Sequence, residues 1–433
     1  MRAWPRGGLW RDPDFLRLWS AQTISQLGSQ VTLLALPLAA IFVLDASTFE
    51  VALVGFFHLL PFLLFALPTG VWVDRLPRRP VLIVADLGRA LALVSLPVAY
   101  WLDALTLPHL YAAGFAAGVL TVFFDVAYLA YLPSLVERGQ LLEGNAKLET
   151  TRSGASVAGP GLGGALVGAL SAPVAILADA LSYVVSALLL ARIRHPDRPV
   201  AVGEKAQRTT MWRELREGLS FVFRQPLLRI LVLVTGGVNF FWNIGLGVVI
   251  VYLVRELELS PAMLGLVIAV GEVGAIGGAV VSGRVARRFG VGRTIVCTAV
   301  LTNIGILAVP LAPPSRPEPV LMVGFLLGAL FGNIFNVNQL SLRQAITPER
   351  LQGRMNSVVR FMYWGPQPVG MVIGGALGSV VGLRETLFFA AGGAALTMVP
   401  LVLNPIRRLD AVPEPPDDPV LSPSVPGAAV DPA

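Results

Sequence analysis

The sequence predicts an all-α integral membrane protein whose twelve transmembrane helices form two bundles of six. The first reason is composition: 55% of the 433 residues are hydrophobic and only 14% are charged, which is more apolar surface than a soluble domain could bury. The second reason is the spacing of the breaks. Apolar stretches of about 20 residues, the length that crosses a bilayer, recur between short charged or Pro/Gly-rich segments.

The spans and the segments that connect them divide the chain into five parts. We expect a cytoplasmic N-terminus, a first bundle, a central cytoplasmic loop, a second bundle and a disordered cytoplasmic tail at 1–14, 15–191, 192–226, 227–404 and 405–433. In the central loop, Trp212, Leu215, Leu219 and Phe223 recur at helical spacing and indicate an amphipathic helix at the membrane surface. The twelve spans are predicted at 16–44, 51–73, 80–102, 109–132, 146–170, 173–191, 227–253, 261–283, 290–311, 319–340, 357–380 and 383–403.

The distribution of basic residues predicts the orientation. Nearly all of the 33 Lys and Arg residues fall at one side of the predicted topology, and only Arg255, Arg316 and Arg384 fall in loops of the opposite side. The positive-inside rule therefore predicts that both termini are cytoplasmic, in the inner membrane of a bacterium. The same rule explains the net charge of +6 without a nucleic-acid partner. Residues 1–14 are polar, so we expect no cleavable signal peptide.

Several functional classes are excluded. Cys297 is the single cysteine and the three histidines are far apart in sequence, so we expect no disulfide, metal site or cofactor. An ATP-driven pump needs a phosphate-binding loop that ends in Gly-Lys-Ser/Thr, and neither Lys147 nor Lys205 fits that pattern. A membrane-embedded enzyme is the other alternative. No pairing of a nucleophile with a base supports it, so we predict a protein that is not an enzyme.

The loop after the second span carries the pattern Gly70-x-x-x-Asp74-Arg75-x-x-Arg78-Arg79. It resembles the loop between helices two and three of the major facilitator superfamily, and the matched order of motifs in the two halves fits that superfamily's parallel repeat. The resemblance implies a latch that joins the halves on the cytoplasmic side and releases during transport. An ordinary positive-inside loop would explain the arginines but not the embedded Asp and Gly.

A second motif, in the fifth span, consists of Gly159, Pro160, Gly163 and Gly164. It resembles the Gly-Pro motif of drug and proton antiporters, although Ala155 replaces the usual leading glycine. Proline removes a backbone donor and glycine removes side-chain bulk, so this helix can bend and pack closely. Glycine-rich packing between helices is the alternative interpretation.

Across nearly the whole chain, four stretches resemble the transmembrane secretion effector branch of that superfamily, which includes siderophore and macrolide exporters. These stretches are 15–28, 74–89, 212–218 and 347–354. The resemblance implies secondary active export of small, partly apolar molecules of the drug, macrolide or siderophore class, by proton antiport and alternating access. A proton-linked importer or facilitator of the same fold remains an alternative. The partners implied are the small-molecule substrate, protons and the lipid bilayer, for a protein that acts as a monomer.

Charged residues inside spans are candidates for proton coupling, because each costs about 2.5–3.5 kcal/mol to insert. We assign this role to Asp125, Glu272 and Asp179, the last of which could instead form hydrogen bonds between helices. Asp86 and Arg89 are three residues apart on the third span, so we interpret them as a structural ion pair.

Polar residues also recur along the helices that the resemblance implies should line the substrate path, which are the first, fourth, seventh and tenth. Hydrogen bonding between helices is an equally good explanation for any one of them. Aromatic residues such as Phe123, Phe124, Trp242, Phe335 and Trp364 add to a roomy amphipathic cavity. The candidate polar residues are Gln22, Gln26, Gln30, Asn239, Asn243, Asn336 and Gln339.

Overall fold

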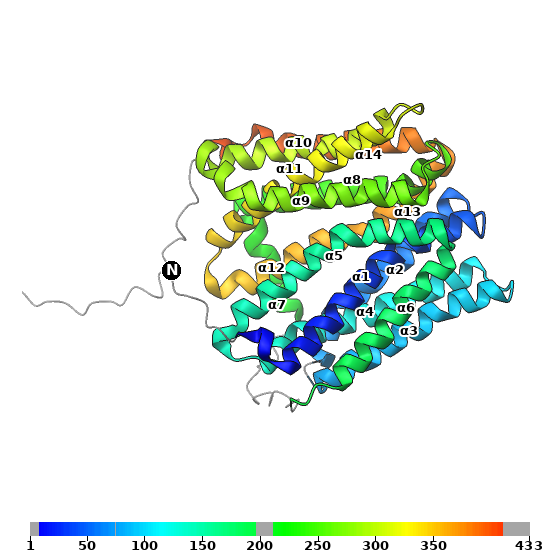
Figure 1. Ribbon diagram of the computed structural model, residues 1–433. Helices are drawn as coiled ribbons and strands as arrows, with labels where there is room; N and C mark the ends of the chain where they lie inside the picture. The colour runs from blue at the N-terminus through cyan, green and yellow to red at the C-terminus, as the bar shows by residue number, and fades with distance from the viewer. Residues whose placement is uncertain (1–7, 74, 196–210, 410–433) are drawn as a thin grey trace, which may run out of the picture.

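A computed structural model describes residues 8–73, 75–195 and 211–409. These segments form long α-helices with short connections (Figure 1). Three short 3-10 helices, η1 (Leu9–Arg11), η2 (Arg138–Gln140) and η3 (Pro405–Arg408), lie between or beside them. The α-helices are α1 (Pro13–Phe42), α2 (Thr48–Val73), α3 (Arg78–Trp101), α4 (Leu107–Leu135), α5 (Leu141–Ala169), α6 (Ala172–Ala191), α7 (Met211–Arg224), α8 (Pro226–Arg255), α9 (Pro261–Phe289), α10 (Val291–Leu311), α11 (Glu318–Ala345), α12 (Glu349–Trp364), α13 (Pro366–Val380) and α14 (Leu383–Leu403).

Local sequence explains where the helices start and stop. The Asp12 carboxylate caps α1 by accepting the backbone N–H groups of Asp14 and Phe15 at 2.8 and 3.1 Å. Ser260 caps α9 in the same way, and Pro261 occupies its first turn. Such caps satisfy backbone donors that have no partner within the helix.

Ten helices of the described residues are long and apolar enough to cross a membrane, and each matches a predicted span. The two other predicted spans differ. The first half of α5 is too polar to count, since it carries Glu143, Lys147, Glu149 and Arg152. The eleventh span was predicted as one helix over 357–380, which is wrong, because α12 ends at Trp364 and α13 begins at Pro366. Proline has no N–H and clashes with the preceding turn of a continuous helix. The count of twelve therefore remains a prediction at these two places.

The helices form two halves, α1–α6 and α8–α14. In Figure 1 the first half lies below the second. We call the end of the bundle at which α1 begins and α14 ends the terminus end, and the opposite end the far end. At the terminus end each half has its own buried core, around Phe15 and Tyr131 in one half and around Leu228 and Met355 in the other. At the far end a single core includes residues of both halves.

Two helix pairs join the halves at the far end. Gly164 of α5 lies so close to α9 that a β-carbon there would overlap the Pro261 carbonyl oxygen and lie 3.1 Å from Gly265 Cα. Gly375 of α13 makes a similar approach to Ala52 of α2. The halves are therefore packed together at the far end and separate toward the terminus end, as Figure 1 shows by the divergence of α5 from α9.

Candidate functional site

A cavity of about 610 Å³ lies between the two halves. This volume falls within the range of pockets that bind drug-sized molecules. Residues of α1, α2, α5, α8, α9, α10, α11, α12 and α13 form its wall. Most of them are aliphatic or aromatic, such as Leu33, Ile250, Trp242 and Phe325. The cavity is thus an apolar chamber shared by both halves.

Three of the predicted polar residues, Gln30, Asn239 and Asn336, line this cavity. Asn333, on the same stripe as Asn336, lines it as well. The amide nitrogens of Asn239 and Asn333 donate to the backbone carbonyls of Thr235 and Ala275 at 2.9 and 2.6 Å. In this arrangement the amide oxygens remain as acceptors.

The other four predicted cavity residues do not line it. Gln22, Asn243 and Gln339 are buried between helices, and Gln26 is half-buried. Asn243 packs against Gly370 of α13, and the Gln339 amide donates to Asn336 Oδ1 at 3.1 Å. The expectation that the fourth helix lines the path is not met in this structure, because α4 supplies no wall residue. This helix packs instead on α2 and α3.

Some of the predicted aromatic residues line the cavity, and the others pack elsewhere. Trp242 and Phe335 line the cavity. Trp364 of α12 stacks on Phe62 of α2 with ring centroids 5.4 Å apart, which forms a contact between the halves. Phe123 stacks on Trp72, and Phe124 is buried in the first half.

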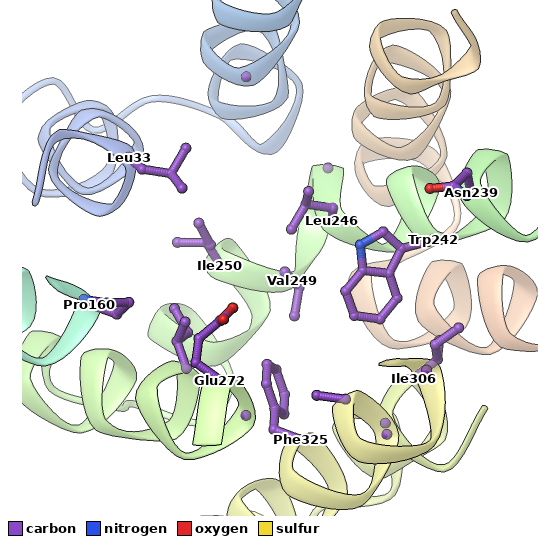
Figure 2. Close-up of a pocket in the computed structure, with 18 of the residues that line it drawn as sticks. Leu33, Pro160, Asn239, Trp242, Leu246, Val249, Ile250, Glu272, Ile306 and Phe325 are labelled. Atoms are coloured by element: carbon purple, nitrogen blue, oxygen red, sulfur yellow. The ribbon is translucent and has the colours of Figure 1, made fainter. Parts of the chain in front are cut away.

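Glu272 of α9 lines the cavity. Figure 2 shows its carboxylate directed into the space between Pro160, Ile250 and Phe325. Among the described residues no hydrogen bond or ion pair reaches this carboxylate. Arg152 of α5, in the other half, is the cation whose charge interacts with it.

A buried charged network occupies the first half, away from the cavity. Asp86 and Arg89 of α3 form the ion pair expected from their spacing. The second carboxylate oxygen of Asp86 accepts a hydrogen bond from Ser186 of α6 at 2.6 Å. The Arg89 guanidinium lies between the rings of Phe124 and Tyr183, at 4.3 and 4.1 Å from their centroids, so cation–π contacts stabilise its charge.

The structure brings two of the three predicted coupling residues to this network. Asp179 of α6 is fully buried and accepts hydrogen bonds from Thr32 of α1 and from Ser182. It therefore makes the interhelical hydrogen bond considered as its alternative role. Asp125 of α4 is half-buried, with no hydrogen bond among the described residues. Both carboxylates interact electrostatically with Arg89, whereas Glu272 is in the other half.

The Gly-Pro motif lies where three helices meet. β-Carbons at Gly159 and Gly163 would press against Gln30 and Val31 of α1, and Gly164 faces α9. A β-carbon at Gly265 of α9 would overlap the carbonyl oxygen of Pro160. The glycines thus permit close packing, and α5 remains one helix through Pro160.

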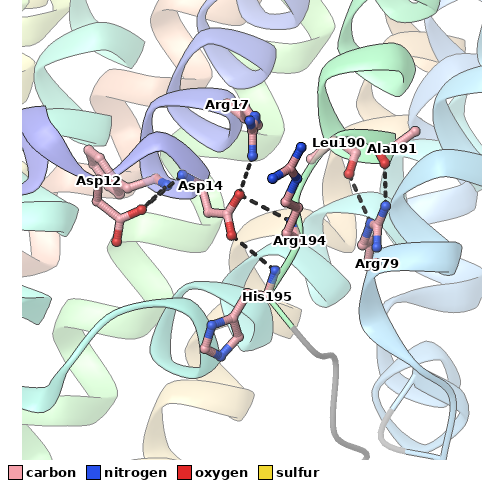
Figure 3. Close-up of polar contacts among 9 residues, drawn as sticks. Asp12, Asp14, Arg17, Arg79, Leu190, Ala191, Arg194 and His195 are labelled. Carbon is pink, nitrogen blue, oxygen red and sulfur yellow. Dashed lines mark hydrogen bonds and ion pairs between the residues drawn. The ribbon is translucent and has the colours of Figure 1, made fainter.

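The loop motif is described only in part, because Asp74 lies outside the described residues. Gly70 makes no close helix approach here, since a β-carbon would have nothing within 4 Å. Arg75 is exposed, and Arg78 is the first residue of α3. Arg79 donates to the Leu190 and Ala191 carbonyls at the end of α6 (Figure 3). This contact lies within the first half.

Three features of the structure were not predicted from the sequence. The Asp14 carboxylate accepts the backbone N–H groups of Arg194 and His195 at 3.1 and 3.0 Å and so holds the chain after α6 against α1 (Figure 3). Gly265 of α9 packs against Gly164 and the Pro160 carbonyl of α5. Arg343 of α11 is 95% buried, and its Nε and Nη1 have no hydrogen-bond partner within the described part of the chain. Only Gly265 had a usable signal, since glycines recur along the predicted eighth span.

Two related helical halves around a shared central cavity define a multi-pass membrane transporter with the major facilitator fold. In agreement, a bacterial homologue of the iron transporter ferroportin, solved in an inward-facing state, superimposes with a TM-score of 0.72 at 18% identity and covers 91% of this chain and 98% of its own. Residues 9–430 match the family described as transmembrane secretion effector, and the chain belongs to that family of transporters.

Two curated relatives cover most of the chain. The multidrug efflux pump Tap of Mycolicibacterium fortuitum is 27% identical over 94% of this chain and 99% of its own length. The enterobactin exporter EntS of Salmonella typhimurium is 29% identical over 79% of this chain and 81% of its own. The protein is therefore similar along its length to transporters rather than to enzymes.

Proposed function

We propose that this protein exports small, partly apolar molecules across the bacterial inner membrane in exchange for protons, as a monomer that works by alternating access. The apolar cavity between two halves that are packed together at one end carries this proposal. A cavity closed on one side is one of the two states that alternating access requires. The named activities of Tap and EntS support efflux over uptake.

The orientation in the proposal rests on the basic residues. If the terminus end is cytoplasmic, as the positive-inside rule predicts, the far end faces the exterior. The cavity is then closed to the outside by the contacts of α5 with α9 and of α2 with α13. The structure would represent the state that loads substrate from the cytoplasm.

Charge balance supports proton coupling in the first half. Asp86, Asp125 and Asp179 share one cation, Arg89. With all three carboxylates ionised, the network would carry two uncompensated negative charges inside the bilayer, which is costly. A proton on Asp125 or Asp179 lowers that cost. These two residues and Glu272 are therefore our candidates for the groups that load and release protons.

The loop motif of Gly70, Asp74, Arg75, Arg78 and Arg79 is proposed to latch the terminus ends together in the opposite state. The open space beside Gly70 supports a released latch in this state. The Gly-Pro motif acts at the opposite end of the bundle, because Gly164 lies in the contact that closes the far end. Each motif would then stabilise one of the two states.

The test is proton efflux from inverted membrane vesicles with an acidic interior, reported by a pH-sensitive dye while drugs, macrolides and siderophores are added singly. A proton-linked exporter releases protons when its substrate is added, and vesicles without the protein do not. Accumulation of solute that leaves the pH gradient unchanged would favour a facilitator. Proton-linked movement of solute out of the vesicles would favour an importer, and either result would refute the proposal.

A further inference from the structure

Few of the side chains that form the cavity wall can carry a charge. Among the described residues that form the wall, Glu272 is the single acidic side chain, and none is Lys or Arg. His58 and Tyr363 are the other titratable groups that line it. One carboxylate therefore dominates the electrostatics of an otherwise apolar chamber.

Among the residues that the structure describes, no group neutralises this carboxylate by contact. Arg152 of α5 interacts with it only over a distance, and its guanidinium is hydrogen-bonded to Glu149 through Nε and Nη2 at 3.0 and 2.6 Å. His58 of α2 also lines the cavity, but no ion pair joins its imidazole to Glu272 among the described residues. An ionised group inside a membrane protein normally pairs with an opposite charge, so Glu272 is left for a ligand or a proton.

The remaining wall also favours a cation. Phe325 lies beside Glu272 and Trp242 faces the same space (Figure 2), and the faces of aromatic rings attract positive charge. The amide nitrogens of Asn239 and Asn333 each donate one hydrogen bond to a backbone carbonyl, and their oxygens are available as acceptors for a cation. An anionic ligand would be repelled by Glu272, which is the one carboxylate among the described wall residues.

We propose that the cavity selects organic monocations with an apolar, aromatic body, and that Glu272 is their counter-ion. This inference names the substrate class of the exporter proposed above and rests on that function only for the claim that the bound cation is transported. Polyanionic solutes such as deprotonated catecholates are excluded. A proton on Glu272 competes with the cation.

The test uses two ions of the same shape and opposite charge, tetraphenylphosphonium and tetraphenylborate, with the purified full-length protein in neutral detergent. Binding is measured by equilibrium dialysis. We expect the phosphonium to bind at least about tenfold more tightly than the borate. This comparison uses the unmodified protein and needs no variant. Equal affinity, or tighter binding of the borate, would overturn the proposal.

Variants then assign the effect to one residue. Glu272→Gln should weaken phosphonium binding by about tenfold or more and reduce the preference for the cation, while Glu272→Asp, which keeps the charge, should restore that preference. Glu318→Gln removes a carboxylate at the far-end start of α11 and should change neither. A preference that survives in Glu272→Gln would refute the role of Glu272.

The vesicle assay separates this inference from the proposed function. Phosphonium that binds through Glu272 but releases no protons would support the cation site and refute proton antiport. Proton release by neutral or anionic compounds alone would support antiport and refute the cation class.

Discussion

The two halves of the molecule share an arrangement of helices but place their buried charges differently. In α1–α6, three carboxylates surround Arg89 at a site whose residues do not line the cavity. In α8–α14, Glu272 lies alone in the cavity wall, and Arg343 is buried with two unpartnered nitrogens. The difference indicates that one half gathers its buried carboxylates around an arginine, whereas the other holds a carboxylate and an arginine that do not pair with each other. Four experiments can break or sharpen this comparison.

The largest effect should come from the buried arginine that has partners. We expect Arg89→Met to lower the free energy of unfolding by about 3–5 kcal/mol, because Asp86 would stay buried without its cation. Arg343→Met is the matched control and should cost little or even stabilise the protein, since it removes a charge that makes no ion pair. Thermal unfolding of both variants in detergent measures this. Equal losses would contradict the comparison.

The next largest effect concerns coupling. Asp125→Asn should reduce proton-linked transport by about a hundredfold, which corresponds to about 2.7 kcal/mol, and should leave phosphonium affinity unchanged because α4 supplies no wall residue. Glu272→Gln should reduce both. Dye-reported proton efflux and equilibrium dialysis on the same preparations measure the two quantities. If Asp125→Asn, Asp179→Asn and Glu272→Gln all keep full proton-linked flux, the assignment of these carboxylates is wrong.

An intermediate effect is expected where the halves touch. Gly164→Ala places a methyl group against the Pro261 carbonyl of α9 and should slow transport about tenfold, since one such step costs about 1.4 kcal/mol. Gly161→Ala on the same helix meets nothing within 4 Å and should be silent.

A labelling experiment shows whether the far end has opened. In a Cys297→Ser background, Ala52→Cys is buried at the other far-end contact, against Gly375 of α13. It should react faster with an impermeant maleimide when Gly164→Ala is added. Equal labelling with and without Gly164→Ala would mean that this glycine does not hold the far end closed.

The smallest effect should come from the surface ion pair between the halves. Arg255 of α8 binds Asp45 at 3.2 Å and the Ala46 carbonyl at 2.9 Å. The Asp45 side chain is fully exposed, and exposed ion pairs contribute little. Asp45→Asn should therefore change transport by about twofold at most, measured in the vesicle assay. A larger loss would mean that this pair, rather than the glycine contacts, keeps the far end closed.

Most of the helices could be predicted from the sequence, but fewer of the residues that line the cavity could. Apolar length and charge spacing located the helices, and the ion pair of Asp86 with Arg89 followed from a three-residue separation. The break at Gly365 was missed because the apolar stretch continues through it. Helical periodicity defines a polar face but not the neighbour that it meets. Gln30 lines the cavity whereas Gln22, two turns earlier on α1, is buried between helices.

Partners from distant segments were the hardest to predict. The contact between Gly164 and Gly265 depends on the register of α5 against α9, which no local pattern encodes. The position of Glu272 within a span was clear, but the lack of a counter-ion among the described residues depends on how the helices pack around it.

The Asp86–Arg89 pair has a consequence for biosynthesis. Both residues belong to one turn of α3, so the helix can enter the bilayer as a neutral segment, whereas each charge alone would cost about 2.5–3.5 kcal/mol. Asp179 differs, because its partner Thr32 lies on α1, which is made before α6. The sixth helix thus completes its hydrogen bonds with a segment already in the membrane, and the first bundle can close before the ribosome has translated the second.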